Sequence, residues 1–95
     1  MSALQEIRDR FTPVLASLTD DVASALSMIR SSQDPKFGDF QANCAMPLAK
    51  KSGVAPRDLA QQMVDRAELD DLCETVEVAG PGFINLKLRT DWLQQ

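Results

Sequence analysis

Residues 79–89 read Ala-Gly-Pro-Gly-Phe-Ile-Asn-Leu-Lys-Leu-Arg, and the rest of the chain can be arranged around this stretch. Its Gly-Pro-Gly is typical of a tight turn, because glycine allows a positive φ and proline presets φ at a turn corner. The residues after the turn alternate in polarity, which predicts a β-strand. Ile84, Leu86 and Leu88 fall on one side of that strand. We expect this side to face a hydrophobic core.

The other side of the predicted strand carries Phe83, Asn85, Lys87 and Arg89. An aromatic ring, a carboxamide and two cations can stack on a nucleobase, hydrogen-bond its edge and lie against phosphate. The same residues also fit a solvated strand face with one exposed Phe, because single apolar residues are common on protein surfaces. The residue types alone favour this second interpretation.

The composition describes one small acidic domain. A chain of 95 residues, 44% of them hydrophobic, can form a single core. Its formal net charge is −4, so it lacks the general basic surface of nucleic-acid-binding proteins. Any contact with nucleic acid would therefore need a local patch or help from a larger basic partner.

No segment of the sequence indicates export or membrane insertion. The apolar pattern from Leu4 to Leu18 is interrupted by charges and by Pro13, and no apolar run approaches the length of a membrane span. We expect a soluble, cytoplasmic, monomeric domain without a membrane partner. In a reducing compartment, Cys44 and Cys73 are expected to be free, buried thiols.

The absence of histidine excludes several kinds of chemistry in these residues. Histidine-based acid–base catalysis, Ser-His and Cys-His nucleophiles, and histidine metal ligands are all ruled out. The pairs Asp20-Asp21 and Asp70-Asp71 are sequence neighbours, whose side chains do not converge on one point. They are better explained by solvation or by charge at a helix N-terminus. The sequence therefore predicts no catalytic residue and no metal site.

Helical spacing marks the N-terminal segment. The apolar residues at this spacing are Leu4, Ile7, Phe11, Leu15 and Leu18. Pro13 lies inside the pattern, so we expect a kink or a break near it. Thr19 then starts a second helical segment, with two aspartates in its first turn. Residues 28–32 fit either a continued helix or a short strand, and we predict the strand.

The middle of the chain predicts a turn at residues 33–36, an extended segment at residues 37–40, and then a helix. Gly38 is expected to be a turn glycine and Asp39 the N-cap of that helix. Its buried stripe is predicted to contain Phe40, Cys44, Ala45, Leu48 and Ala49. Lys50, Lys51 and Gly53 suit its C-terminal end. Pro47 predicts a local kink, near which Asn43 is expected to satisfy the backbone.

The last part of the chain predicts one more helix and a pair of strands. Pro56 suits the first position of a helix that ends near Leu69. A connector at residues 70–74 leads to a strand at residues 76–79. Another apolar pattern starts at residues 91–93, just before the chain stops. We therefore expect residues 1–95 to be a single domain cut from a longer chain.

The expected fold is α+β with two layers. It consists of a four-stranded antiparallel sheet with helices on one face, in the order α-β-β-α-β-β. The other face of the sheet would be left for solvent or a partner. Gly80, Pro81 and Gly82 would support the turn that presents Phe83 on this free face.

Three stretches together carry a family resemblance. The first is Asp-Pro-Lys-Phe-Gly-Asp-Phe-Gln-Ala-Asn at residues 34–43. The second joins Ala-Lys-Lys at residues 49–51 to Pro-Arg-Asp-Leu-Ala at residues 56–60, and the third is Val-Glu-Val-Ala-Gly-Pro-Gly-Phe-Ile-Asn at residues 76–85. In order and spacing they resemble the N-terminal additional domain of arginyl-tRNA synthetase. The resemblance covers most of the chain and is weakest before about Ser27.

The resemblance implies a tRNA-binding domain of a class I synthetase, which contacts the D-loop at the outer corner of tRNA(Arg). Phe83 and Asn85 match the aromatic residue and the amide by which the family contacts a D-loop base. Lys87 and Arg89 would be phosphate contacts or simply solvating charges. The resemblance thus points to the same strand face that the alternating polarity indicated, the one with Phe83 and Asn85. It favours recognition of a nucleobase on that face.

The family's catalytic signatures, a His-Ile-Gly-His-like and a Lys-Met-Ser-Lys-like motif, are absent. The resemblance therefore implies that ATP, Mg²⁺ and arginine–tRNA ligation belong to a catalytic domain elsewhere in the same chain, and that this domain is not itself an enzyme. Pro47 departs from many relatives, so the middle helix is expected to differ locally.

A second interpretation stays open, in which the Phe83 face docks another protein, and the acidic charge favours it. Asn85 could also be a strand-edge amide that bonds to backbone.

Overall fold

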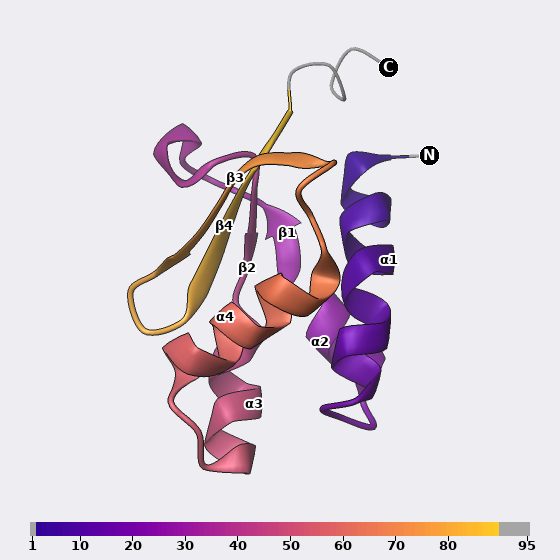
Figure 1. Ribbon diagram of the computed structural model, residues 1–95, viewed down its shortest axis with the longest axis vertical. Coiled ribbons are helices and arrows are strands. Elements are labelled where there is room, and N and C mark those ends of the chain that lie inside the picture. The colour runs from indigo at the N-terminus through magenta and orange to yellow at the C-terminus, as the bar shows by residue number, and fades with distance from the viewer. Residues whose placement is uncertain (1, 90–95) are drawn as a thin grey trace.

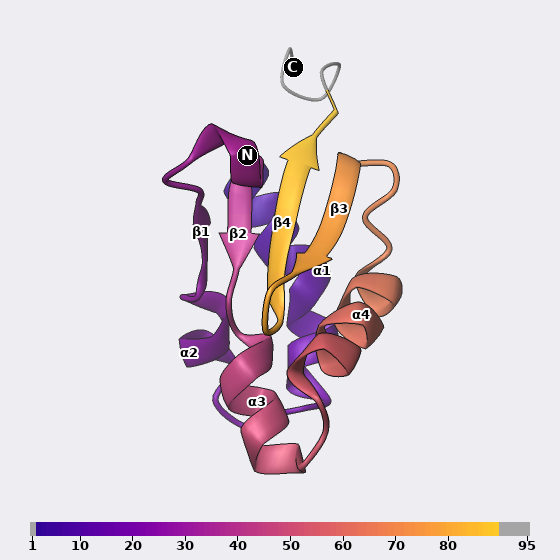
Figure 2. The same cartoon turned by 90° about the vertical axis from the view of Figure 1, so that its left-hand side faces the viewer.

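The computed structural model describes residues 2–89, in which four strands form one antiparallel sheet in the order β1-β2-β4-β3. The strands are β1 (Ile29–Ser31), β2 (Phe40–Ala42), β3 (Cys73–Ala79) and β4 (Phe83–Leu88). The helices are α1 (Ala3–Ala16), α2 (Val22–Leu26), α3 (Ala45–Ser52) and α4 (Pro56–Ala67). They leave one face of the sheet uncovered, as a comparison of Figures 1 and 2 shows. The predicted α+β class and the antiparallel four-stranded sheet are confirmed.

β4 lies in the centre of the sheet, and its apolar side faces the core as predicted. Leu86 is opposite Phe40 on β2 and Val76 on β3, so apolar residues line up across three strands. Ile84, Leu86 and Leu88 are buried. Burial of each such side chain stabilises the fold by roughly 1.5–3 kcal/mol. The alternation in β4 therefore determines which face of the whole sheet meets the helices.

The N-terminal helix runs through Pro13 without a break. α1 continues from Ala3 to Ala16, and Pro13 is exposed to solvent. An exposed proline of this kind leaves the freed carbonyl one turn earlier accessible to water, which lowers the cost of the missing hydrogen bond. The second predicted helix is present as α2, but its predicted start at Thr19 was wrong. Asp21 is its N-cap and accepts a hydrogen bond from the Ser24 backbone N–H, so neither Asp20 nor Asp21 lies in the first turn. The strand chosen for residues 28–32 is confirmed as β1.

The predicted start of the middle helix was wrong. Residues 35–37 form a short 3₁₀ helix, η1 (Pro35–Phe37), and residues 40–42 form β2. The helix begins only at Ala45, after Cys44 as N-cap, so Asp39 caps nothing here. Pro47 therefore lies in the first turn of α3, where the missing N–H would have had no helical partner, and the predicted reason for a kink disappears.

The remaining elements follow the local signals closely. Gly53 ends α3 with a φ of 73°, and Pro56 begins α4. β3 begins at Cys73, three residues earlier than predicted, and its pairing with β4 has an irregularity between Cys73 and Thr75. The apolar pattern predicted at residues 91–93 lies outside the described residues. None of the helices within residues 2–89 has the length and apolar character that crossing a membrane requires.

Both cysteines are free and buried, as predicted. Cys44 packs in the core beside α3, and Cys73 begins β3. Burial raises the pKa of each thiol to about 11, because the thiolate loses its hydration. Both side chains are therefore protonated, unreactive core residues at neutral pH.

Candidate nucleic-acid interface

The candidate site lies on the uncovered face of the sheet, which Figure 2 views directly. Figure 1 shows that η1 and the β3–β4 turn both project towards this side, away from α1. The open face of the sheet is therefore bordered by one loop at each end. Strand register places Arg30, Gln41, Asn85 and Glu77 in one row across the four strands.

Phe83 stands at the turn end of this face. It is half-buried at the start of β4, opposite Ala79. A Cβ atom on Gly80 would lie 3.2 Å from the Phe83 ring, so the ring rests over this glycine. The turn is closed by a hydrogen bond from the Gly82 amide to the Ala79 carbonyl at 3.2 Å.

The other two turn residues also define how the hairpin is held. Pro81 is exposed at the tip of the turn. Gly82 has a φ of 126°, and a Cβ atom on it would lie 3.0 Å from the Cβ of Pro56. The hairpin tip is therefore packed closely against the start of α4, which positions Phe83 relative to the helical layer.

Asn85 lies on the same face but is 8% exposed. Its Oδ1 accepts a hydrogen bond of 2.9 Å from Nε2 of Gln41, which is directly opposite on β2. The contact therefore joins two side chains on the central strands and does not involve a strand edge or the backbone. A buried carboxamide on an otherwise open sheet face is unusual for a purely solvated surface.

A shallow pocket of about 180 Å³ opens beside Asn85. Its other lining residues are Pro35, Lys36, Phe37, Gly38, Thr75, Glu77 and Lys87. Phe37 is 41% exposed, and the Lys36 ammonium lies 5.6 Å from the centroid of its ring. The pocket thus combines an aromatic wall, a carboxamide, the cationic side chains of Lys36 and Lys87 and one carboxylate, on Glu77.

The loop that carries Phe37 is held firmly on β4. The Asp39 amide donates to the Leu86 carbonyl at 2.7 Å, and the Leu88 amide donates to the Asp39 carboxylate at 2.8 Å. Gly38 has a φ of 92°, and a Cβ there would lie 2.5 Å from the Leu86 carbonyl oxygen. Gly38 and Asp39 therefore act as loop anchors, and the predicted helix cap is replaced by this role.

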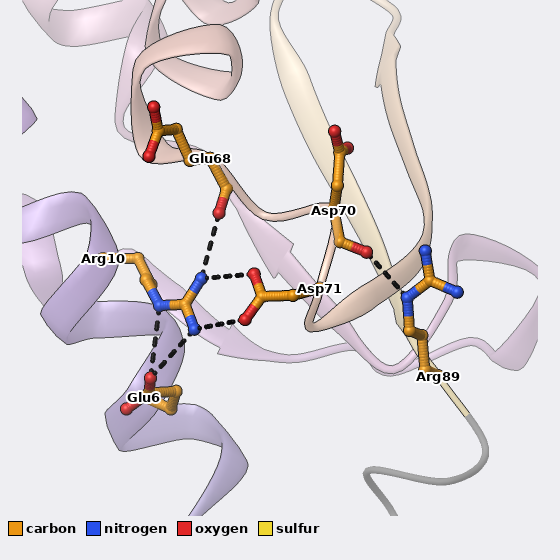
Figure 3. Close-up of polar contacts among 6 residues, drawn as sticks. All are labelled: Glu6, Arg10, Glu68, Asp70, Asp71 and Arg89. Carbon is orange, nitrogen blue, oxygen red and sulfur yellow. Dashed lines mark hydrogen bonds and ion pairs between the residues drawn. The ribbon is translucent and has the colours of Figure 1, made fainter.

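The remaining predicted site residues have different surroundings, and these residues are Lys87, Arg89 and Asn43. Lys87 is exposed on the open face and lies 3.5 Å from the Glu74 carboxylate. Arg89 follows the strand, and its Nε donates to the Asp70 carbonyl at 2.7 Å, so it is engaged at the α4–β3 connector (Figure 3). The backbone N–H of Asn43 donates to the Met28 carbonyl, whereas the side-chain Oδ1 of Asn43 is buried with no hydrogen-bond partner among residues 2–89.

Figure 3 shows a second polar cluster, which the sequence did not predict. Arg10 on α1 donates to both carboxylate oxygens of Asp71, at 2.8 and 2.9 Å, and also to Glu6 and to the Glu68 carbonyl. This bidentate hydrogen bonding lowers the pKa of the Asp71 carboxyl to about 2. Asp71 therefore joins α1 to the α4–β3 connector and is more than a solvated charge.

The pocket beside this cluster does not suit phosphate. It measures about 680 Å³ and includes four carboxylates, on Asp65, Glu68, Asp70 and Asp71, around Arg10. Acidic side chains repel nucleic acid, so the candidate interface is the Asn85 face. No group of three or more His, Cys, Asp or Glu side chains within residues 2–89 is arranged to hold a metal ion.

Sequence reasoning did not single out Gln41 or Phe37 as site residues. The polarity pattern Phe-Gln-Ala at residues 40–42 is the signal that could have found Gln41, because alternation puts it on the polar face. It was hidden by the assignment of these residues to a helix. Phe37 had no local signal, since its position over β4 depends on the contacts of Gly38 and Asp39 with that strand.

Comparisons with known proteins show which family this sequence resembles. The family model described as "Arginyl tRNA synthetase N terminal domain" matches residues 5–88. An arginine–tRNA ligase of Rhodopirellula baltica is 51% identical over 83 residues, which are 87% of this chain and 12% of that protein. One of Synechocystis sp. is 43% identical over 94 residues, which are 98% of this chain and 16% of that protein.

A third relative, the arginine–tRNA ligase of a Haemophilus influenzae strain, is 52% identical over 67 residues, or 70% of this chain and 12% of that protein. The chain thus spans 12–16% of the length of these three relatives. A family model that matches nearly all of the described residues, together with this level of identity, establishes that the chain belongs to the family of arginyl-tRNA synthetase N-terminal domains.

Proposed function

We propose that this domain contacts the D-loop at the outer corner of tRNA(Arg) within an arginine–tRNA ligase. The observation that carries the proposal is the buried carboxamide of Asn85 on an open sheet face, with a pocket beside it and Phe83 two positions away on the same strand. Protein surfaces that recognise unstacked bases combine aromatic rings with polar groups directed at base edges.

Each residue of this face would have a distinct part in recognition. Phe83 would stack on a D-loop base, which is worth roughly 1–3 kcal/mol per base in nucleic-acid complexes. Asn85 would hydrogen-bond to the edge of that base. Lys87, whose ammonium lies 3.5 Å from the Glu74 carboxylate, would lie near phosphate. Arg89, which is engaged by the Asp70 carbonyl, contributes less to this surface.

The charge distribution fits a domain that assists a larger enzyme. The net charge of −4 gives weak attraction to RNA in general, while Arg30, Lys36 and Lys87 place cations around the open face. The domain would then add selectivity to binding that the rest of the ligase provides. ATP and Mg²⁺ would be bound by the catalytic domain in the same chain, and this domain needs no cofactor of its own.

The test belongs in the complete ligase, where tRNA affinity does not depend on this domain alone. Phe83→Ala and Asn85→Ala should both lower kcat/KM for tRNA(Arg), and Asn85→Ala should also reduce the preference among bases substituted in the D-loop. Val54→Ala removes an exposed apolar side chain from the α3–α4 connection and is the control. Thermal unfolding measured in parallel separates recognition from stability.

If Phe83→Ala and Asn85→Ala leave both kcat/KM and base preference at wild-type values, the open face does not contact tRNA. Protein docking through the Phe83 face would then be the better explanation. Salt dependence distinguishes the two, because tRNA binding weakens steeply with salt whereas apolar docking responds little.

A further inference from the structure

The hydrogen bond between Gln41 and Asn85 determines which way the Asn85 carboxamide is turned. Gln41 Nε2 donates to Asn85 Oδ1 at 2.9 Å, and strand register places the two residues directly opposite each other on β2 and β4. An amide side chain has one acceptor oxygen and one donor nitrogen on the same carbon. When the oxygen is turned towards β2, the nitrogen is directed away from it.

The side of Asn85 that faces away from β2 is the pocket side. On β3, Glu77 is opposite Asn85, and both residues line the pocket of about 180 Å³. Two side-chain atoms within residues 2–89 are buried without a hydrogen-bond partner, Arg8 Nε and Asn43 Oδ1. Asn85 Nδ2 is not one of them and has no partner within those residues, so it reaches the surface of the pocket.

We infer that Gln41 is a positioning residue that sets the hydrogen-bonding polarity of the base pocket. Asn85 presents a donor there, so the recognised base presents an acceptor at that point. Phe37 lines the same pocket, and its exposed ring offers a surface on which a planar base can stack. This inference rests on the proposed function, because it specifies what the Asn85 face recognises.

Two changes reverse the polarity by different routes. In Gln41→Glu the carboxylate can only accept, so Asn85 must turn its NH₂ group towards β2 and present its oxygen to the pocket. In Asn85→Asp one carboxylate oxygen keeps the Gln41 hydrogen bond and the other presents an acceptor. Both variants should therefore shift preference towards bases that offer a donor at this point.

The D-loop position is first identified as the one at which Asn85→Ala changes the base preference. The measurement is then kcat/KM of the complete ligase for four tRNA(Arg) transcripts, each with a different base at that position. Gln41→Glu and Asn85→Asp should change the rank order of the bases, with ratios shifting roughly 2- to 10-fold. Gln41→Met cannot hold the amide in place and should flatten the preference without a change of charge. Gln62→Glu, at an exposed position of α4, makes the same charge change away from the site and should leave the order unchanged.

The outcomes separate this inference from the proposed function. If Phe83→Ala and Asn85→Ala leave both kcat/KM and base preference at wild-type values, the proposed function fails, and this inference fails with it. If Asn85→Ala abolishes the preference while Gln41→Glu and Gln41→Met both keep the wild-type rank order, Gln41 does not set the polarity and this inference alone fails. If Gln41→Glu does not fold, Gln41→Met still decides between these results, because it removes the donor that holds Asn85.

Discussion

The carboxylate of Asp39 accepts a hydrogen bond of 2.8 Å from the backbone N–H of Leu88, although the two residues are 49 positions apart. The Asp39 amide in turn donates to the Leu86 carbonyl at 2.7 Å. Together these bonds extend the pairing of β2 and β4 beyond the last backbone pair. They also hold the loop that carries Phe37 over the open face, so one aspartate links the core strand to the candidate site.

Asp39→Ala should lower the free energy of unfolding by about 1–3 kcal/mol, because the Leu88 N–H loses its charged acceptor. Asp39→Asn keeps an acceptor oxygen and should cost less. Urea unfolding of the three proteins measures the difference. An alanine variant as stable as the wild-type protein would show that this hydrogen bond contributes nothing.

Gly38→Ala should destabilise the fold more than Gly53→Ala. Both glycines have positive φ, at 92° and 73°. Gly53 lies in the left-handed αL region, which costs an L-residue roughly 1–2 kcal/mol, whereas a ψ of −161° places Gly38 in a region that is essentially restricted to glycine. At Gly38 the new Cβ would also lie 2.5 Å from the Leu86 carbonyl oxygen, whereas nothing lies within 4 Å at Gly53. Forcing this contact apart should add roughly 1–3 kcal/mol, measurable by thermal or urea unfolding. Equal losses would mean that the η1 loop moves away from β4 without cost.

The contact between Arg10 and Asp71 should stabilise the fold in a pH-dependent way. Hydrogen bonding to Arg10 lowers the Asp71 pKa from 3.8 to about 2, so the charged form is favoured in the folded state. The stabilisation is fully present above about pH 4–5, which is just above the ordinary pKa of an aspartate. It is lost as the pH falls towards about 2, the pKa of Asp71 in the folded state.

A double-mutant cycle of Arg10→Gln and Asp71→Asn measures this coupling directly. We expect the coupling energy at pH 7 to be small, because Asp71 is largely exposed. The coupling energy should shrink in high salt and disappear near pH 2. A coupling energy that is unchanged between pH 7 and pH 2 would contradict the assignment to this ion pair.

Lys87→Ala should weaken tRNA binding for every D-loop sequence and make it less dependent on salt. Removal of one phosphate contact lowers the slope of log K against log salt by about 1. Lys50→Ala, near the C-terminal end of α3, is the control with the same charge change. An identical salt slope for both variants would place Lys87 outside the interface.

Local sequence signals determined a large part of this fold. The Gly-Pro-Gly turn and the alternation in β4 were sufficient to predict the hairpin and its core face, because turn geometry and strand periodicity depend on near neighbours. The same holds for the Gly53 stop, the Pro56 start and the position of Phe83 and Asn85 on one strand face. Each of these features is encoded within a few residues.

The contacts that complete the candidate site depend on tertiary structure. Gln41 and Asn85 are 44 positions apart, and Arg10 and Asp71 are 61 positions apart. Periodicity indicates which face of a strand a residue occupies, but it does not indicate which strand will lie next to it or at which register. Asp39 illustrates the reason. An aspartate before an apolar pattern suits the N-cap of a helix. In the folded protein, however, its carboxylate accepts a hydrogen bond from the Leu88 backbone N–H, which only the approach of β4 brings close.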